Sequence, residues 1–268
     1  EFQNFLIEFR LHGYAKYYTK GLHKEISKLF GLKLGQRIIP HITLYGPATT
    51  NDIKHAISII QRIGQKYQLV PFTINGFSHF SERSNVVSLD IEPSPELKRL
   101  RLELSEALQK ISSCQQWDKS QEFKFHSTIV LGFPDNKLSQ IWNYIQQKRT
   151  PNIQQHLLRI TVLGHNRKMI CEYDLVLKKL FYRTQAISRY SWRATINKYR
   201  DLRLLKLRGT RKSIFFIGDL HLDHANIIKY CHRPFSNVRM MNRILISNWK
   251  RAVKDDGVVY LLGDLAFG

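Results

Sequence analysis

Two short segments of the sequence place a histidine two residues before a threonine. The first is HITLYG, which contains His41 and Thr43, and the second is HSTIVLG, which contains His126 and Thr128. Both segments are apolar and are predicted to be β-strands, in which side chains point alternately to opposite faces. Each histidine therefore shares a face with its threonine. One such triplet would mean little, but two, each followed by an aliphatic residue and a glycine, indicate a repeated functional strand.

Two histidines that face one cleft can cleave a phosphodiester by acid–base catalysis without a metal ion. The ordinary imidazole pKa of about 6.5 allows one ring to be neutral while the other is protonated near neutral pH. The neutral ring can activate water and the protonated ring can donate to the departing oxygen, each contributing on the order of 10²–10⁴-fold. The hydroxyls of Thr43 and Thr128 would hold the phosphoryl oxygens. The competing interpretation is a pair of strand edges whose polar residues only face water.

The elements around the two strands repeat along the chain. The order strand, helix, His-x-Thr strand, helix, strand occurs twice, which indicates an internal duplication. Asn51 is predicted to cap the helix after the first of these strands. His79, with Ser81 at the same offset, falls in a turn-like stretch and is interpreted as surface. The predicted elements are strand 5–11, helix 14–30, turn 35–40, the first His-x-Thr strand, helix 51–63, strand 71–77, strand 85–91, helix 95–111, the second His-x-Thr strand, helix 137–147, strand 157–163 and strand 169–180.

The charge balance favours a polyanionic partner. The chain has 42 Lys and Arg against 21 Asp and Glu, a formal net charge of +21. Nucleic acid is the commonest partner of so basic a protein, although a phosphate-rich small molecule or an anionic membrane would also satisfy the electrostatics. Residues 183–213 concentrate this charge, with ten Lys or Arg against one Asp and three interleaved aromatic residues. They are interpreted either as a segment that clamps RNA or as a solvated basic linker helix.

The cysteines and the apolar runs bear on location. Cys114, Cys171 and Cys231 are widely spaced without a CxxC pair, which suits a reducing cytoplasm and argues against a disulfide framework or a cysteine zinc site. No apolar run approaches the roughly 20 residues of a membrane span, and no signal segment opens the chain. Because the sequence starts at Glu1 without methionine, we expect it to be a fragment.

The doubled motif at His41/Thr43 and His126/Thr128 resembles the two-histidine phosphoesterase superfamily, in particular its RNA 2′,3′-cyclic phosphodiesterase and 2′-5′ RNA ligase branch. The resemblance covers roughly residues 1–180. It implies an α+β, bilobal fold with a central cleft, and one motif from each duplicated lobe. It also implies that an RNA 2′,3′-cyclic phosphate is opened to a 2′-phosphate, or that RNA ends are joined through a 2′-5′ linkage. By analogy, His41 would protonate the leaving O3′ and His126 would activate water.

Two other functions remain compatible with these residues. One is a protein that grips RNA without catalysis, with the histidines acting only as ligands; the basic aromatic segment is its best support. The other keeps the catalytic cleft but takes a small cyclic nucleotide or an ADP-ribose cyclic phosphate. The resemblance implies no cofactor for this domain, RNA with 2′,3′-cyclic phosphate ends as the partner, and no membrane. The protein is expected to be a cytoplasmic monomer.

A different pattern begins after residue 213. Strand 214–217 runs directly into Gly218-Asp219-Leu220-His221, and strand 258–262 runs into Gly263-Asp264, with helices 225–230 and 238–253 between them. Alternation of strand and helix predicts parallel strands, whose carboxyl ends are where α/β sheets bind ligands. Asp219, His221 and Asp264 could therefore ligate divalent metal ions. The alternative is that they are solvated loop residues.

This segment resembles calcineurin-like metallophosphoesterases, which open with Asp-x-His and Gly-Asp motifs. The resemblance implies that Asp219 and His221 bind one metal and that Asp264 bridges a pair of Mn, Fe or Zn ions roughly 4 Å apart. The segment departs from that family at Phe267, where many members carry an acid, and it ends before the family's later ligands. The predicted organisation is a two-histidine domain at 1–182, a basic linker at 183–212 and a truncated α/β metallophosphoesterase segment at 213–268.

Overall fold

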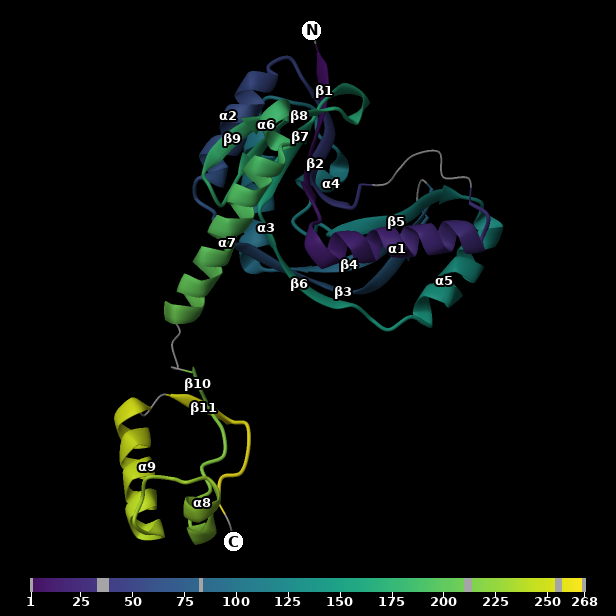
Figure 1. The fold of residues 1–268 in the computed structure, drawn as a ribbon. Helices are drawn as coiled ribbons and strands as arrows, with labels where there is room; N and C mark the ends of the chain where they lie inside the picture. The colour runs from purple at the N-terminus through teal and green to yellow at the C-terminus, as the bar shows by residue number, and fades with distance from the viewer. Residues whose placement is uncertain (1, 33–38, 82–83, 210–213, 254–256, 267–268) are drawn as a thin grey trace. The chain divides into compact units, whose positions relative to one another are not determined.

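The structure is a computed structural model that describes residues 2–32, 39–81, 84–209, 214–253 and 257–266. It divides into two compact units, one ending at Tyr199 and the other beginning at Arg200 (Figure 1). Most of the predicted turn at 35–40, the end of the predicted linker at 210–212 and Phe267 lie outside the described residues.

The first unit contains two antiparallel sheets, and a His-x-Thr strand lies at one edge of each. The alternating apolar residues of the sequence produce these strands, and the predicted duplication and α+β class are present. The first sheet has the order β2 (His41–Thr50), β1 (Gln3–Arg10), β7 (Arg159–Leu163), β8 (Met169–Asp174) and β9 (Lys179–Tyr182). The second has the order β5 (His126–Phe133), β4 (Asn85–Pro93), β3 (Val70–Phe80) and β6 (Asn152–Leu157).

Two helices of the first unit each pack against the motif strand of the other sheet. Helix α1 (Gly13–Leu29) precedes β2 in the chain but packs against β5, along which it lies in Figure 1. Helix α3 (Pro95–Leu108) precedes β5 but packs against β2 and against α2 (Ile53–Gly64). Helix α5 (Leu138–Gln146) follows the second motif and packs on β3. This reciprocal packing helps to bring the two motif strands together.

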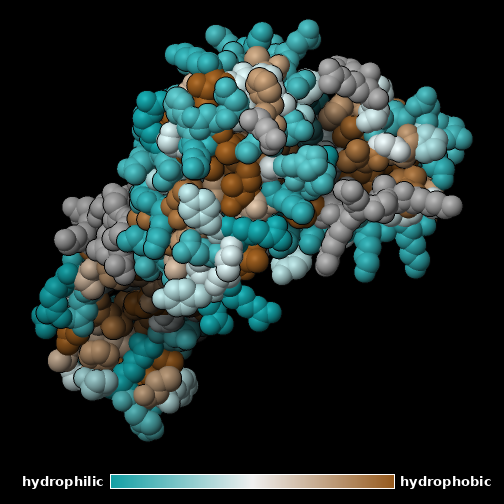
Figure 2. Space-filling model, turned by 90° about the horizontal axis from the view of Figure 1, so that it is seen from above, coloured by the Kyte–Doolittle hydropathy of each residue, from teal (hydrophilic) through white to brown (hydrophobic). Residues whose placement is uncertain are grey.

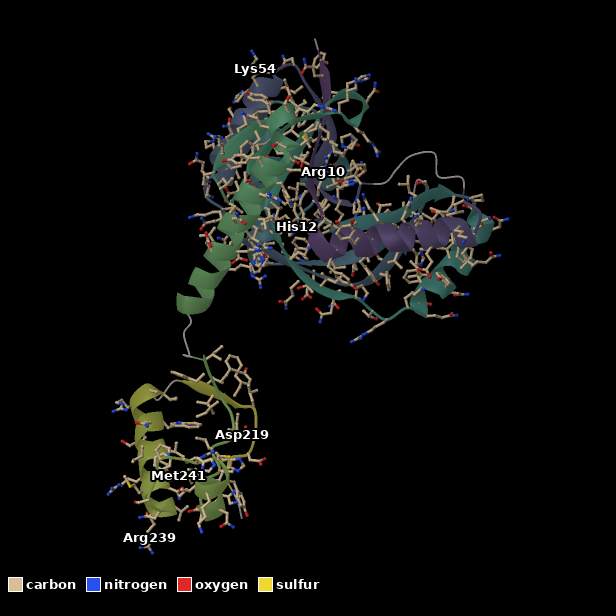
Figure 3. The ribbon with its side chains drawn as sticks, viewed as in Figure 1. Arg10, His12, Lys54, Asp219, Arg239 and Met241 are labelled. Carbon is tan, nitrogen blue, oxygen red and sulfur yellow. The ribbon has the colours of Figure 1, made fainter. Side chains whose placement is uncertain are left out.

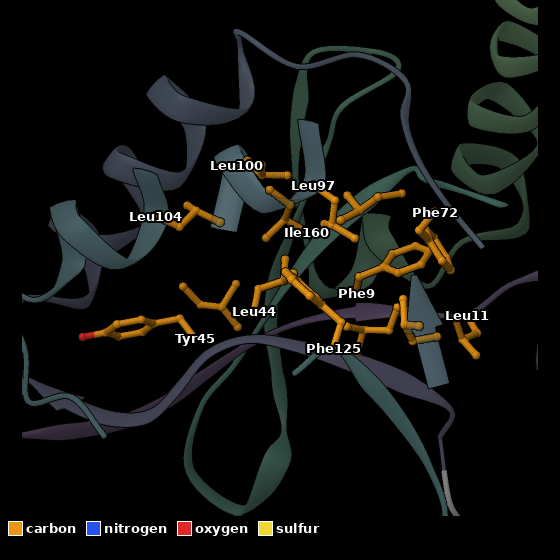
Figure 4. Packing of buried hydrophobic residues seen from close by; sticks show 14 of the residues in the cluster. Phe9, Leu11, Leu44, Tyr45, Phe72, Leu97, Leu100, Leu104, Phe125 and Ile160 are labelled. Atoms are coloured by element: carbon orange, nitrogen blue, oxygen red, sulfur yellow. The ribbon is translucent and has the colours of Figure 1, made fainter. Parts of the chain in front are cut away.

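One apolar core holds the sheets and helices of this unit in place. It forms because the apolar faces of strands from both sheets and of the covering helices are buried against one another. Figure 4 shows part of this packing, including Leu44 of β2, Phe125 beside β5 and Ile160 of β7. Phe9 of the first sheet meets Phe72 of the second edge to face, with ring centroids 5.4 Å apart.

Several details of the first unit differ from the sequence-based prediction. Residues 157–163 were predicted as one strand, but the chain breaks at Leu158, so that β6 pairs in one sheet and β7 in the other. The predicted strand 169–180 is likewise two strands, β8 and β9. The cap of α2 is Asp52 rather than Asn51, because the Asp52 carboxylate accepts a hydrogen bond of 2.9 Å from the backbone N–H of His55.

The segment predicted as a basic linker begins with two helices, α6 (Arg183–Ala186) and α7 (Arg189–Gly209). The first turns of α7 pack on the first sheet through a buried polar cluster around Arg159. The Arg159 guanidinium donates to Asp174 (2.9 Å) and Glu172 (3.1 Å) of β8, and also to Thr195 of α7 (3.2 Å from Nε). Residues up to Tyr199 therefore belong to the first unit.

The second unit contains a two-stranded parallel sheet, as predicted from the alternation of strands and helices. Strand β10 (Ile214–Ile217) pairs with β11 (Val258–Leu261), and α8 (Ala225–Tyr230) and α9 (Val238–Ala252) lie between them in the chain. The Asn237 side chain caps α9 by accepting from the Met240 N–H at 2.8 Å. Met241 is fully buried in this unit.

Hydrophilic side chains cover most of the face seen in Figure 2, with smaller apolar patches between them. Among the residues that the structure describes, none of the helices combines the length and the apolarity that crossing a bilayer would require.

Candidate functional site

The two His-x-Thr strands present their polar residues on one face, as their spacing predicted. In β2, His41 and Thr43 are half-buried while Ile42 and Leu44 are buried. In β5 the same alternation makes His126 and Thr128 half-buried and leaves Ser127 and Ile129 fully buried. The two strands are in contact across the two sheets, so both pairs of polar residues belong to one region of the molecule.

Each motif ends at a glycine whose backbone conformation favours that residue. Gly46 has φ of 93° and Gly132 has φ of 71°, both in the left-handed region. At Gly46 a Cβ atom would lie 2.9 Å from the backbone nitrogen of Ala48, which is too close for any side chain. The Gly46 N–H donates to the buried Asp118 carboxylate at 3.2 Å, which fixes the end of β2. Burial raises the pKa of Asp118.

Both catalytic candidates hold their rings in the same way. Nδ1 of His41 lies 2.8 Å from the carbonyl oxygen of Ile39, and Nδ1 of His126 lies 3.0 Å from that of Lys124. Because a carbonyl oxygen only accepts hydrogen bonds, each Nδ1 carries a hydrogen. Nε2 is therefore the atom of each ring that can take up or release a proton.

The surroundings of Nε2 differ between the two histidines. Nε2 of His41 lies close to a buried carboxylate. The Glu8 carboxylate of β1, which is 2% exposed, lies 3.7 Å from Nε2 of His41 and forms an ion pair with the ring when it is protonated. The other carboxylate oxygen accepts a hydrogen bond of 2.7 Å from Nε of Arg10. Glu8 and Arg10 lie opposite Thr43 and His41 in the register of β1 and β2, so all four residues share one face.

His126 lies in surroundings that favour its neutral form. Burial is the main cause that lowers the pKa of His126, and the nearby charges of His41 and Lys124 lower it further. The hydrogen bond to the Lys124 carbonyl and the charge of Asp90 oppose these effects without reversing them. Phe80 packs edge-on against the ring with centroids 5.0 Å apart, which adds to its desolvation.

Three other ring side chains near the motifs take part in packing. His79 is exposed, but it lies on β3 rather than in a turn and packs on Trp142 with centroids 4.5 Å apart. Tyr45 and Phe125, which flank the motifs, are core residues. Glu8 was missed by sequence reasoning. In the sequence, Glu8 is an acidic residue two positions before Arg10 in an alternating strand. The local sequence does not show which strand pairs with this one.

The second unit brings the predicted metal ligands together. One potential ligand atom from each of Asp219, His221 and Asp264 lies within 4.8 Å of the others, at the carboxyl ends of β10 and β11. Asp219 and His221 have φ of 37° and 49°, a strained conformation that is common at functional sites. A Cβ atom on Gly263 would lie 2.3 Å from Oδ1 of Asp219, so only glycine permits this approach.

Arg233 fixes the loop that carries two of these residues. Its guanidinium donates to the carbonyl oxygens of Asp219 and Leu220, each at 2.7 Å. The carboxylate groups are exposed, and Figure 3 labels Asp219 in the second unit. Two carboxylates and an imidazole are a ligand set that divalent transition metals accept, so these residues fit a metal ion.

Paired His-x-Thr strands at the edges of two antiparallel sheets define a class of two-histidine phosphoesterases, and a family comparison agrees. A family model described as the 2′-5′ RNA ligase superfamily matches residues 19–168, which include both motifs. The chain belongs to this superfamily. The match ends before β8, α6 and α7 and does not reach the second unit, so the metallophosphoesterase interpretation rests on the residues of that unit.

Curated relatives extend the comparison. A protein of Geobacillus sp. (strain WCH70), named as a phosphoesterase, is 29% identical over 115 residues, 41% of this chain and 62% of that protein. One named in the same way from Geobacillus kaustophilus (strain HTA426) is 29% identical over 113 residues, 41% and 61% of the two chains. Uncharacterized protein MJ1445 of Methanocaldococcus jannaschii is 59% identical over 54 residues, 20% and 31% of the two chains.

The chain thus spans 31% to 62% of the length of these relatives. Among solved structures, Kluyveromyces marxianus Usb1 with uridine monophosphate has a TM-score of 0.38 and 12% sequence identity, over 60% of this chain and 92% of that chain. A second structure of Kluyveromyces marxianus Usb1 has a TM-score of 0.39 and 9% identity over the same shares.

Proposed function

We propose that the first unit opens 2′,3′-cyclic phosphates at RNA ends to 2′-phosphates without a metal ion, or carries out the related 2′-5′ ligation. The observation that supports this proposal best is the paired arrangement of two imidazoles, each presenting Nε2, on adjacent edges of two sheets. Membership of the 2′-5′ RNA ligase superfamily and the net charge of +21 both favour RNA as the substrate.

The different surroundings of the two histidines support an assignment of acid and base. His126, whose pKa is lowered, would take a proton from water as the water attacks phosphorus. The protonated His41, paired with Glu8, would donate its Nε2 proton to O3′ as the phosphorus–O3′ bond breaks. The product is a 2′-phosphate with a free 3′-hydroxyl. Thr43 and Thr128 would donate hydrogen bonds to the phosphoryl oxygens.

The test is hydrolysis of an RNA oligomer that ends in a 2′,3′-cyclic phosphate, in the presence of EDTA. We expect turnover to a 2′-phosphate, whereas a 3′-phosphate product would contradict the assignment of His41 to O3′. If the oligomer binds but is not hydrolysed, the first unit is an RNA-binding protein without catalysis. If only mononucleoside or ADP-ribose cyclic phosphates are opened, the substrate is a small nucleotide.

Replacing Glu8 tests the role of its carboxylate. We expect Glu8→Gln to lower the rate of cyclic-phosphate opening about tenfold. The reason is that the amide no longer pairs with the protonated ring of His41. Initial rates on an RNA oligomer with a terminal 2′,3′-cyclic phosphate measure the change.

Glu92→Gln provides a matched control for this change. Glu92 is an exposed glutamate of β4 that contacts Asn75 at 3.4 Å and lies outside the two motifs. Its variant should show the wild-type rate. Equal effects of the two substitutions on the rate would contradict a specific pairing between Glu8 and His41.

We also propose that Asp219, His221 and Asp264 hold a divalent metal ion, with Mn, Fe or Zn as candidates and a metal pair in a complete metallophosphoesterase domain. The convergence of their ligand atoms within 4.8 Å and the strained loop support this proposal. A bound ion would polarise a phosphate and supply hydroxide at neutral pH. Asp219 and Asp264 would provide the negative charge that attracts it.

Metal binding can be measured without an activity assay. We expect Mn²⁺ titration, followed by electron paramagnetic resonance, to show binding that Asp264→Asn weakens by more than about tenfold. Asp223→Asn is the control, because Asp223 lies in the same loop but bonds to Asn242 instead of joining the cluster. Equal Mn²⁺ affinity in all three proteins would contradict the site.

The remaining expectations about the protein are proposals of the same kind. We propose a cytoplasmic monomer, which is compatible with three free cysteines, Cys114, Cys171 and Cys231.

A further inference from the structure

A cavity of about 280 Å³ lies on the first unit, where α6 and α7 meet the first sheet. Its floor is formed by residues of β1, β7 and β8, and its walls come from the start of α1 and from residues 186–192. The family match ends at residue 168, so α6 and α7 add this wall to the part of the chain that the superfamily shares. The volume is just below the roughly 300–1,000 Å³ of typical ligand pockets, which suits a single nucleotide.

The cavity lies on the same face of the sheet as the proposed catalytic histidine. Arg10 lines the cavity and is the direct cross-strand neighbour of His41. Its guanidinium binds one oxygen of the Glu8 carboxylate, and the other oxygen faces Nε2 of His41. One carboxylate thus connects the cavity wall with the catalytic ring. Arg10 therefore borders both the cavity and the proposed catalytic histidine.

The lining combines positive charge with an exposed aromatic ring. Lys16 is half-buried and Arg189 is exposed, and within the described residues neither forms an ion pair with a carboxylate. Trp192 is 36% exposed and packs against His12, with ring centroids 6.0 Å apart. Figure 3 shows His12 at the junction of β1 and α1. Cations and a stacking ring are the groups that hold single-stranded RNA.

The acid in the lining does not oppose an anionic ligand. Glu172 is 7% exposed, and its two oxygens are occupied by the Arg159 guanidinium and the Thr161 hydroxyl. Burial lowers the pKa of His12, which favours the neutral form of this ring. The free charge of the cavity is therefore positive and lies at Lys16 and Arg189.

We propose that this cavity binds the penultimate nucleotide of the RNA, the one that precedes the terminal 2′,3′-cyclic phosphate. Its base stacks on Trp192, and the phosphate that links it to the terminal nucleotide lies between Lys16 and Arg189. The inference rests on the proposed function, because it assumes that the terminal cyclic phosphate lies at the two histidines. In this proposal, α6 and α7 determine whether the protein prefers a substrate longer than one nucleotide.

The test compares a dinucleotide that ends in a 2′,3′-cyclic phosphate with the corresponding mononucleoside cyclic phosphate. The wild type is expected to prefer the dinucleotide by about tenfold in kcat/KM, the effect of roughly one stacked base. Trp192→Ala and Arg189→Glu should each bring this ratio close to one, and Trp192→Phe should retain most of it. Arg189 is exposed, so its variant does not depend on repacking of the core.

Lys54→Glu is the control, because it makes the same change of charge on the exposed surface of α2, away from the cavity (Figure 3). It should keep the wild-type ratio. A wild-type ratio near one, or a ratio that Trp192→Ala and Arg189→Glu leave unchanged, would overturn the proposal. This includes the case in which the variants lose activity equally on both substrates, which would place the terminal base in the cavity.

A binding experiment separates failure of this inference from failure of the proposed function. Fluorescence anisotropy of a labelled tetranucleotide with a terminal 2′-phosphate needs no turnover. Arg189→Glu should weaken binding about tenfold more than Lys54→Glu does, even if the wild type hydrolyses no cyclic phosphate. Equal weakening by the two variants would overturn the role of the cavity, whatever the activity assay shows.

Discussion

Replacing either His41 or His126 with alanine is expected to lower the rate of cyclic-phosphate opening by about 10²–10⁴-fold. In the proposed mechanism each ring has one task that the other cannot perform in the same step, because one takes a proton from water while the other protonates the leaving oxygen. The double variant should therefore be little slower than either single variant, as for groups that act as a unit. Initial rates on an RNA oligomer with a 2′,3′-cyclic phosphate, with EDTA present, measure all three.

His55→Ala serves as the matched control, since His55 is an exposed histidine on α2, outside the two motifs. Its rate should equal that of the wild type. Activity that both catalytic variants retain but that EDTA abolishes would assign the reaction to the Asp219, His221 and Asp264 cluster. Binding of the oligomer should survive in both catalytic variants, which separates loss of chemistry from loss of fold.

The second large effect concerns stability. Arg159→Met is expected to lower the free energy of unfolding of the first unit by about 3–5 kcal/mol. Arg159 is 3% exposed and is the cation that neutralises Glu172 and Asp174, which are 7% and 0% exposed. Methionine keeps much of the volume but leaves two buried carboxylates without their positive partner. Urea unfolding, followed by far-ultraviolet circular dichroism, measures the change.

Lys66→Met is the comparison, because Lys66 pairs with Glu103 at 2.7 Å on the surface, with 60% of the lysine side chain exposed. Such pairs contribute less than about 1 kcal/mol. Removing a carboxylate together with Arg159, as in Arg159→Met with Glu172→Gln, should recover part of the loss. If Arg159→Met lowers the free energy of unfolding no more than Lys66→Met does, the buried polar cluster around Arg159 does not stabilise the packing of α7 on the sheet.

The sequence alone was sufficient to predict many of the strands and helices of the first unit, because the patterns that indicate them are local. Alternation of apolar residues located the motif strands, and the glycine that follows each motif reflected a real backbone constraint at Gly46 and Gly132. The convergence of Asp219, His221 and Asp264 in the second unit was also foreseeable, since two parallel strands bring their carboxyl ends to the same edge. The catalytic roles themselves stay predictions.

What could not be foreseen depends on contacts between distant segments. The break at Leu158 moves the chain from one sheet to the other within what looks like a single apolar run. Glu8 lies beside His41 because of the register of β1 with β2. The basic segment after residue 183 has the composition of a linker, yet Thr195 hydrogen-bonds Arg159 in the buried cluster and Trp192 forms part of the cavity.

The two histidines belong to separate hydrogen-bonded ladders, and apolar side chains between the sheets hold β2 beside β5. The edge-to-face contact of Phe9 with Phe72 is one of these links. Protein interiors respond to volume changes as small as one methylene. We therefore expect changes in apolar core residues to alter the distance between the imidazoles. Under the proposed function, such changes would favour either a compact cyclic phosphate or the wider junction of two RNA ends.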